Sequence, residues 1–319
     1  MLRERVLAWY DAHARALPWR QPPATTENRD PYRVWVSEVM LQQTRVVAMI
    51  EHYHEFLHRF PKVEKLAAAR EASVLAAWSG LGYYRRARMM HRAAKMIMHE
   101  LAGNFPETAA EWRKLPGVGR YTAAAISSIA FGEPVAVVDG NVERVLQRIS
   151  GQRLAGEALW QAAELWLDRE RPGDFNQALM ELGATVCTPR APMCLACPVI
   201  ELCTTRGELS GATKLQPQKK REIHYVLDRC DGAVFLVQRG RDARLMPGMW
   251  ELPQMERPVD QATPFLTVRH SITVTDYTVR VWRKRTTSNS RGRWIEFRRL
   301  PKLAITGLTR KILRRAHLM

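Results

Sequence analysis

Hydrophobic residues recur every three or four positions through the first two thirds of the chain. The stretch from Val34 to Phe60 has this spacing and lacks strand-like alternation, which is the pattern of helices that bury one face. The same spacing predicts further helices over residues 71–80, 86–101, 121–132, 141–150, 156–169 and 174–187, with Gly or Pro near their ends. The chain from residue 1 to 208 is therefore predicted to be an all-α domain.

The pattern changes after residue 208. Residues 209–222 are polar and basic with few apolar positions, which is typical of a linker. Short runs of β-branched and aromatic residues follow at 232–239, 265–274, 275–285 and 292–300, and the chain closes on a helical pattern. We therefore expect a small α+β domain over residues 223–319.

The charge of the chain narrows the choice of partners. Its 319 residues include 49 Lys and Arg against 32 Asp and Glu, a net charge of +17. Such a balance favours nucleic acid or an anionic membrane surface as the partner. The sequence has no apolar run of the roughly 20 residues that a membrane span needs. Its N-terminal stretch lacks the apolar segment of a signal peptide, so we expect a cytoplasmic protein with no membrane role.

Four of the five cysteines lie in one short segment. Cys187, Cys194, Cys197 and Cys203 have the spacing C-x6-C-x2-C-x5-C. Four thiolates so close together suit a zinc ion or an iron–sulfur cluster, and the spacing alone leaves both open. We expect a structural metal site whose loop carries Arg190 as a candidate phosphate contact.

The stretch LPGVGRYTA, residues 115–123, places two glycines directly before a helix. Gly117 and Gly119 permit close approach of the backbone to another molecule. The free N–H groups at the start of the helix form an anion site. In a chain of this charge the expected anion is a DNA phosphate, while an ordinary tight connection between helices is the alternative.

Two carboxylates are candidates for catalysis. Glu38 lies among the apolar residues of VWVSEVML, where burial would raise its pKa as a general acid at neutral pH requires. The alternative is an exposed glutamate paired with Arg45. Asp139 follows an apolar run and precedes Gly140, so it is either a catalytic carboxylate or the N-terminal cap of the next helix.

Several stretches together resemble one family. They are PYRVWVSEVMLQQT, GLGYYRRAR, LPGVGRYTAAAI, VDGNVERV and FNQALMELGATVC, with the four-cysteine segment. In combination they resemble the MutY family of adenine DNA glycosylases, which belongs to the helix–hairpin–helix superfamily and is related to endonuclease III. The resemblance covers nearly all of residues 1–205. GAVFLVQRGRDARLMPGMWELP is similar to the start of that family's Nudix-like C-terminal domain.

The resemblance implies a function and a cofactor. It implies two helical lobes with double-stranded DNA between them and a [4Fe–4S] cluster held by the four cysteines. It also implies a monofunctional enzyme of base excision repair that removes adenine mispaired with 8-oxoguanine or guanine. We expect a monomer that associates with the nucleoid through DNA.

The resemblance also assigns catalytic roles. Glu38 would protonate adenine N7, Asp139 would stabilise the oxocarbenium-like sugar, and Asn141 would support Asp139 and the attacking water. Breaking an N-glycosidic bond needs a protonated leaving group and a negative charge near the sugar, as in glycosidases. Tyr121 stands where strand-cleaving relatives have a Schiff-base lysine, so little strand cleavage is expected.

Binding roles follow from the same resemblance. The adenine pocket is formed by Leu17, Trp19, Arg20, Val46 and Glu181, and core packing is the alternative for the apolar members. Gln43 and Tyr83 would wedge into the duplex beside 8-oxoguanine. Further DNA contacts come from Thr44, Gly117, Val118, Gly119, Arg120 and Arg190.

Two stretches depart from the family pattern. Gln21–Asp30 is longer than the usual link and would change the rim of the adenine pocket. The family reads 8-oxoguanine with a Phe-Ser-His loop, whereas the aligned residues here are Ile272-Thr273-Val274. Thr273 would donate one hydrogen bond and His270 would replace the imidazole. A related glycosylase with altered opposite-base preference, or a catalytically silent DNA-binding protein, is the alternative function.

Overall fold

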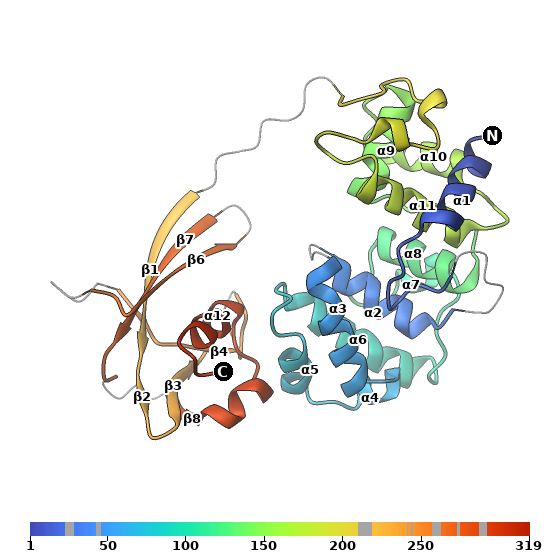
Figure 1. Ribbon diagram of the computed structural model, residues 1–319. Helices are drawn as coiled ribbons and strands as arrows, with labels where there is room; N and C mark the ends of the chain where they lie inside the picture. The colour runs from blue at the N-terminus through green and yellow to red at the C-terminus, as the bar shows by residue number, and fades with distance from the viewer. Residues whose placement is uncertain are drawn as a thin grey trace. The chain divides into compact units, whose positions relative to one another are not determined.

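The protein, described by a computed structural model, forms two compact units (Figure 1). The first comprises Met1–Ala67 and Arg92–Thr213, and the second comprises Ala68–His91 and Lys214–Met319. The structure describes residues 1–22, 29–42, 46–209, 219–240, 242–243, 245–256, 263–272, 275–286 and 292–319. Within these ranges, none of the helices combines the length and the apolar character needed to cross a membrane.

Helices dominate the first unit, as the hydrophobic spacing predicts. They are α1 (Leu2–His13), α2 (Pro31–Leu41), α3 (Val46–Arg59), α4 (Val63–Ala67), α7 (Ala109–Trp112), α8 (Arg120–Phe131), α9 (Gly140–Ser150), α10 (Gly156–Trp166) and α11 (Pro172–Thr185). Two short 3₁₀ helices follow, η1 (Cys194–Ala196) and η2 (Ile200–Leu202). α6 (Arg85–Glu100) begins among residues of the second unit and ends among those of the first.

Aspartates cap the N-termini of α2, which carries Glu38, and of α9, whose cap is Asp139 itself. Asp30 accepts hydrogen bonds from the backbone N–H groups of Tyr32 (2.9 Å) and Arg33 (3.3 Å) at the start of α2. Asp139 caps α9 in the same way. Such caps satisfy N–H groups that have no partner within the helix, and they therefore define where α2 and α9 begin.

Two glycines let α11 pack closely against its neighbours. A Cβ on Gly173 would lie 2.5 Å from the carbonyl oxygen of Ser128 on α8. A Cβ on Gly183 would lie 2.6 Å from the Cβ of Asn141 on α9. Both distances are shorter than real contacts allow, so these positions need glycine. The close packing places α11 directly beside α8 and the start of α9, which carry residues of the candidate site.

A mixed sheet forms the centre of the second unit. Its strands, in spatial order, are β5 (Gln254–Met255), β1 (Lys219–Leu227), β7 (Thr275–Arg283) and β6 (Leu266–Ile272). β1 and β7 are parallel, and the other pairs are antiparallel. A second sheet contains β2 (Arg229–Cys230), β3 (Ala233–Gln238), β4 (Trp250–Glu251) and β8 (Gly292–Glu296). The 3₁₀ helix η3 (Phe297–Lys302) and the helix α12 (Gly307–Arg315) follow, which confirms the predicted combination of strands and a closing helix.

β1 begins inside the predicted linker. Its first residues, from Lys219, are exposed and polar, so they lack the apolar alternation that marks a strand. They become a strand because they pair in register with β7, starting opposite Thr275. The prediction of a linker is therefore wrong for residues 219–222, and residues 210–218 lie outside the described part of the chain.

The second unit also includes α5 (Glu71–Ala77) and the start of α6, although their residues lie within the predicted all-α range. α5 packs against η3. The side-chain hydroxyls of Ser79 and Tyr84 both donate hydrogen bonds to the backbone carbonyl of Ile305, at 3.0 and 3.2 Å. Helical periodicity could not reveal this grouping, because it depends on contacts with residues more than 200 positions away.

Candidate active site

Glu38 lies on α2 with only 5% of its surface exposed. The residues around it, from Val34 to Met40, are buried as well. Burial disfavours the charged carboxylate and raises the pKa of Glu38 to about 7. A hydrogen bond from Tyr121 opposes this shift, and the nearby charge of Asp139 adds to it. The predicted burial and raised pKa are confirmed, and Glu38 is not an exposed glutamate.

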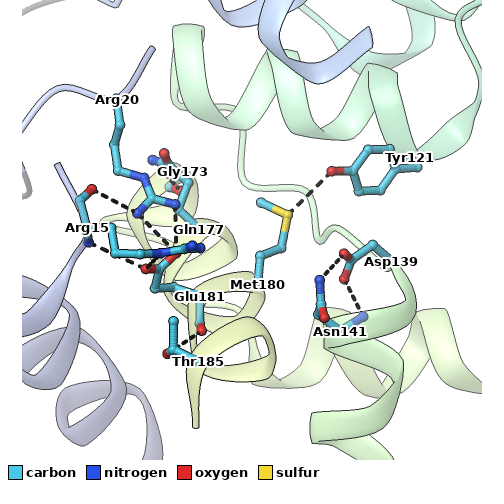
Figure 2. A network of polar contacts seen from close by, with 10 residues as sticks. All are labelled: Arg15, Arg20, Tyr121, Asp139, Asn141, Gly173, Gln177, Met180, Glu181 and Thr185. Carbon is cyan, nitrogen blue, oxygen red and sulfur yellow. Dashed lines mark hydrogen bonds and ion pairs between the residues drawn. The ribbon is translucent and has the colours of Figure 1, made fainter. Parts of the chain in front are cut away.

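Tyr121 connects α8 to this acid. Its hydroxyl donates a hydrogen bond to Glu38 Oε2 at 2.7 Å. The same hydroxyl lies 3.4 Å from the sulfur of Met180 on α11, as Figure 2 shows. Burial, together with the charges of Glu38 and Asp139, raises the pKa of Tyr121 well above its usual value. The phenol therefore stays protonated at neutral pH.

Asp139 and Asn141 form the third part of the site, at the start of α9 (Figure 2). Asp139 Oδ1 accepts hydrogen bonds from the backbone N–H groups of Asn141 (2.9 Å) and Val142 (2.8 Å). Asp139 Oδ2 accepts a hydrogen bond from Asn141 Nδ2 at 2.8 Å. Three donors thus surround this carboxylate at the positive end of a helix, where negative charge is favoured.

Arg144 is a residue of this site that the sequence patterns did not single out. Its guanidinium donates hydrogen bonds to Asn141 Oδ1 (2.8 Å), the Gly183 carbonyl (2.6 Å) and the Cys187 carbonyl (2.6 Å). Because Arg144 holds Oδ1 of Asn141, the amide Nδ2 is directed to Asp139. Its contact with Asn141 could have been expected from their spacing of three residues on one helix. Its contacts with α11 and the cysteine segment could be found only in the tertiary structure.

Glu181 on α11 forms a second charged cluster, with two arginines (Figure 2). It is almost fully buried. It accepts two hydrogen bonds from the Arg15 side chain, that from Nη2 at 2.9 Å, and two from Arg20 at 3.2 Å each. Burial opposes the charge of Glu181, but the two arginines outweigh that effect and lower its pKa. Glu181 and Arg20 were predicted to lie together, whereas no sequence pattern indicated a contact for Arg15, which lies between Ala14 and Ala16.

The other predicted pocket residues lie in the same unit. The Leu17 carbonyl accepts a hydrogen bond from the Arg20 backbone N–H at 2.9 Å. Trp19 packs edge-to-face against Tyr53, with ring centroids 5.4 Å apart. Val46 is half-buried at the start of α3. Leu17 and Trp19 therefore belong to one short segment with Arg20, and their contact with adenine stays a prediction.

The glycine hairpin precedes α8. Gly117 has the left-handed φ of 80° that favours glycine, and Val118 is buried. Gly119 is different, because its φ of −90° is open to any residue. A Cβ on Gly119 would meet none of the described atoms within 4 Å. Glycine at this position is therefore not explained by the backbone or by packing among the described residues.

Arg120 is engaged by α10. Its guanidinium donates two hydrogen bonds to the Glu157 carboxylate (2.6 and 3.1 Å) and lies 4.0 Å from the ring centroid of Trp160. These contacts join the hairpin to α10. Arg190, in contrast, is exposed in the cysteine segment. DNA contacts by either arginine stay predictions.

The predicted wedge and lesion-reading residues are described only in part. Tyr83 is exposed in the loop between α5 and α6. His270 is half-buried on β6, where burial and the charge of Lys311 lower its pKa. Gln43, Thr44, Thr273 and Val274 lie outside the described residues.

The four predicted metal ligands line one pocket of about 390 Å³, a volume that includes its open mouth. Apolar residues such as Val145 and Leu182 line it too, together with Arg148 and Arg206. Arg148 Nη1 lies 3.4 Å from Cys187 Sγ. In the described parts of the chain, no three His, Cys, Asp or Glu side chains are grouped closely enough to hold a single metal ion.

Sequence comparison places this site in a known family. The HhH-GPD family, described as "HhH-GPD superfamily base excision DNA repair protein", matches residues 36–164. An adenine DNA glycosylase of Schizosaccharomyces pombe is 33% identical over 318 residues, a match covering 80% of this chain and 69% of the relative. The chain belongs to the adenine DNA glycosylase family. The Mus musculus adenine DNA glycosylase is 49% identical over 223 residues, which cover 66% of this chain and 43% of the relative. This chain therefore spans less than half the length of that relative.

A solved structure supports the helical fold. A thermostable thymine-DNA glycosylase is similar with a TM-score of 0.59 and 29% identity, covering 64% of this chain and 94% of that chain. The helical fold of this adenine DNA glycosylase family member is thus shared with a glycosylase named for a different base. The structural likeness therefore supports the fold more strongly than the choice of base.

Proposed function

We propose that this chain is an adenine DNA glycosylase of base excision repair that acts on adenine mispaired with 8-oxoguanine or guanine. The proposal rests mainly on the burial and the raised pKa of Glu38. This residue is a buried acid with a pKa of about 7, in a hydrogen bond with Tyr121 and in the electrostatic field of Asp139. Such a group holds a proton at neutral pH and releases it readily, which is what a general acid needs.

Glu38 performs the first chemical step in this proposal. Because Glu38 Oε2 accepts the hydrogen bond from Tyr121, the acidic proton is carried by Oε1. Its transfer to adenine N7 turns the base into a neutral leaving group, and the N-glycosidic bond breaks. Tyr121 holds the carboxyl in place and does not compete for the proton, because its own pKa is strongly raised.

Asp139 acts on the sugar. Bond cleavage leaves positive charge on the deoxyribose ring, and a carboxylate close to that charge lowers the barrier. The N–H donors of α9 and the Asn141 amide hold the Asp139 carboxylate in one orientation. Asn141, held in turn by Arg144, also orients the attacking water.

Glu181 and its arginines recognise the base. Adenine must leave the helix stack to reach these groups. Arg15 and Arg20 together supply the four hydrogen bonds that a carboxylate accepts, so in this proposal Glu181 exchanges one from Arg20 for one from the exocyclic amine of adenine. Arg15 and Arg20 keep Glu181 ionised, so a base that presents an acceptor in place of the amine is disfavoured.

The glycine hairpin and the positively charged residues of the chain bind the DNA duplex in this proposal. Gly119 leaves open space at the start of α8, so a phosphate can approach the free N–H groups of that helix. The net charge of +17 supplies attraction to DNA of any sequence. We assign recognition of the base opposite adenine to the strand-rich unit. This unit is proposed to be a Nudix-like domain in which Thr273 and His270 contact 8-oxoguanine.

Single-turnover excision tests the function. Duplexes carry adenine opposite 8-oxoguanine, guanine, thymine or cytosine, with the enzyme in excess. Excision should be fastest opposite 8-oxoguanine and next fastest opposite guanine. Equal rates for all four duplexes contradict the proposed mispair preference, and a lack of product from every duplex contradicts the glycosylase itself.

Replacing Tyr121 with Lys should introduce a covalent intermediate. A neutral lysine amine attacks the sugar carbon and forms a Schiff base, whereas a phenol cannot. Borohydride reduction is expected to trap a protein–DNA adduct with Tyr121→Lys and none with the wild type. Tyr121→Phe is the control, because it keeps the ring and supplies no nucleophile. If the lysine variant excises adenine and forms no adduct, residue 121 does not face the sugar.

The four clustered cysteines are proposed to hold a [4Fe–4S] cluster. All four line one pocket, and Arg148 and Arg206 supply positive charge against four thiolates. When bound, the cluster would tie the cysteine segment to the helices behind it. Arg148 already orders this segment by donating to the Thr188 and Pro189 carbonyls, at 2.7 and 3.0 Å.

Chemical analysis of the purified chain tests the cofactor. We expect about four iron and four sulfide per chain, with both lost in Cys197→Ser together with a lower unfolding temperature. Cys230→Ser is the matched control, because Cys230 lies on β2 in the other unit. Zinc in place of iron, or full iron content in Cys197→Ser, contradicts the assignment.

A further inference from the structure

The loop that carries Tyr83 has an unusual backbone. Gly80, Gly82 and Tyr83 all have positive φ, at 111°, 69° and 44°. Glycine adopts such values readily, but a tyrosine does so only where its surroundings hold it there. The side chain of Tyr83 is nevertheless 45% exposed. The restraint must therefore come from residues on either side of it.

Both ends of the loop are held by one atom. Ser79 Oγ and Tyr84 Oη each donate a hydrogen bond to the Ile305 carbonyl, at 3.0 and 3.2 Å, and the two hydroxyls lie 3.3 Å apart. Ser79 begins the loop and Tyr84 ends it, and both side chains are buried. A carbonyl oxygen accepts two hydrogen bonds, so Ile305 uses its full capacity on this loop.

The Ile305 carbonyl belongs to a rigid part of the strand-rich unit. Trp250 N–H donates to the Ala304 carbonyl at 2.8 Å, and Thr306 N–H donates to the Trp250 carbonyl at 2.9 Å. Ile305 itself is fully buried in the core of this unit. The anchor is therefore held by backbone hydrogen bonds on both sides.

Arg86 packs against the loop and its neighbour Trp78. Its guanidinium lies 5.5 Å from the Trp78 ring centroid and 5.6 Å from the Tyr83 ring centroid. It also donates a hydrogen bond to the Leu81 carbonyl at 3.3 Å. Burial lowers the pKa of Arg86 to about 10, so it remains charged at neutral pH. The Tyr83 ring thus rests on a cation that is itself bound to the loop backbone.

We propose that Ser79 and Tyr84 are positioning residues that hold Tyr83 in its DNA-wedging conformation, with the Ile305 carbonyl as their shared anchor. This rests on the proposed function, in which Tyr83 enters the duplex beside the base opposite adenine. The wedge is then braced by the same unit to which reading of that base is assigned. Without the two hydroxyls, the backbone of Tyr83 relaxes out of the left-handed region and the ring loses its place.

The first test removes the hydroxyls and measures the wedge directly. The duplex carries 2-aminopurine next to 8-oxoguanine, and its fluorescence rises when Tyr83 separates it from its neighbour. Ser79→Ala/Tyr84→Phe in the full chain should reduce the equilibrium population with high fluorescence by roughly 30-fold, the change expected from two lost neutral hydrogen bonds at about fivefold each. Tyr84→Phe alone, a milder change, should reduce it in the same direction.

A double-mutant cycle separates positioning from general damage. The two hydroxyl substitutions are repeated in a Tyr83→Ala background. If they act through Tyr83, they have no further effect on adenine excision there, because the group that they position is gone. Equal fold-losses in both backgrounds overturn the inference. Wild-type fluorescence in Ser79→Ala/Tyr84→Phe, with the protein folded, overturns it as well.

Tyr32→Phe is the matched control. The Tyr32 hydroxyl is also buried and also donates to a backbone carbonyl, that of Phe60 at 2.7 Å, but in the first unit. It should lower the unfolding temperature and leave the fluorescence rise unchanged. If the wild type excises adenine but Tyr83→Ala does not reduce fluorescence, the wedge and this inference fail while the glycosylase stands. If the wild type excises no adenine, the proposed function fails first and the inference with it.

Discussion

Replacing Glu38 with Gln is expected to slow adenine excision by about 10³-fold, within the range of general acid catalysis. Gln has nearly the shape of the protonated carboxyl and can still accept the hydrogen bond from Tyr121, but it cannot deliver a proton. Affinity for the mispaired duplex should therefore persist. Single-turnover rates and DNA binding at fixed salt check both parts. In the wild type, excision should decline as the pH rises above about 7, because Glu38 then loses its proton.

The same substitution should change stability in a pH-dependent way. The pKa of Glu38 in the folded chain, about 7, lies above the ordinary value of 4.5. The native state therefore binds this proton more tightly, and the wild type loses stability as the pH rises from the lower value to the higher. Gln avoids that loss, so Glu38→Gln should gain about 3 kcal/mol in free energy of unfolding relative to the wild type by about pH 8. Denaturant unfolding at several pH values measures this difference.

Glu251→Gln is the matched control for both measurements. Burial also raises the pKa of Glu251, which lies in the strand-rich unit and pairs with Arg239 at 2.9 Å. Its replacement should leave excision unchanged. Substantial excision by Glu38→Gln would contradict the assignment of the acid, whatever its stability.

Replacing Asp139 with Ser is expected to lower excision by about 10²–10³-fold, as for other removed electrostatic contacts to a transition state. Ser is as good an N-terminal cap as Asp, so α9 should keep its start and the protein its stability. What Ser lacks is the negative charge beside the sugar. The pair of measurements therefore separates the two alternatives that the sequence leaves open, a helix cap and a catalytic carboxylate.

Two further variants complete this comparison. Asp139→Ala removes cap and charge together, and should also lower the free energy of unfolding by about 1 kcal/mol. Asp30→Ser makes the same replacement at the cap of α2, where Asp30 accepts from two backbone N–H groups as Asp139 does. It should leave excision intact. If Asp139→Ser is as active as Asp30→Ser, Asp139 is a cap and nothing more.

The local elements of this chain were largely predictable. Periodic apolar positions predict the helices around Glu38 and Tyr121, because a helix that buries one face must repeat them every three or four residues. β1 was not predicted as a strand, and its start was assigned to the linker, since Lys219 and its neighbours are exposed and have no alternation. They form a strand only because β7 lies beside them.

The sequence by itself determined the family and the helical and strand-rich parts, and it singled out Glu38 and Asp139 as candidates, because these depend on local patterns and motifs. Only the tertiary structure decided that Arg15 pairs with Glu181, that Arg144 joins Asn141 to α11 and the cysteine segment, and that Ser79 and Tyr84 share the Ile305 carbonyl. Apart from the hydrogen bond between Arg144 and Asn141, which are three residues apart, each of these contacts joins residues that are distant in sequence. Their hydrogen-bonding partners are set by how the helices and sheets pack, and no local pattern carries that information.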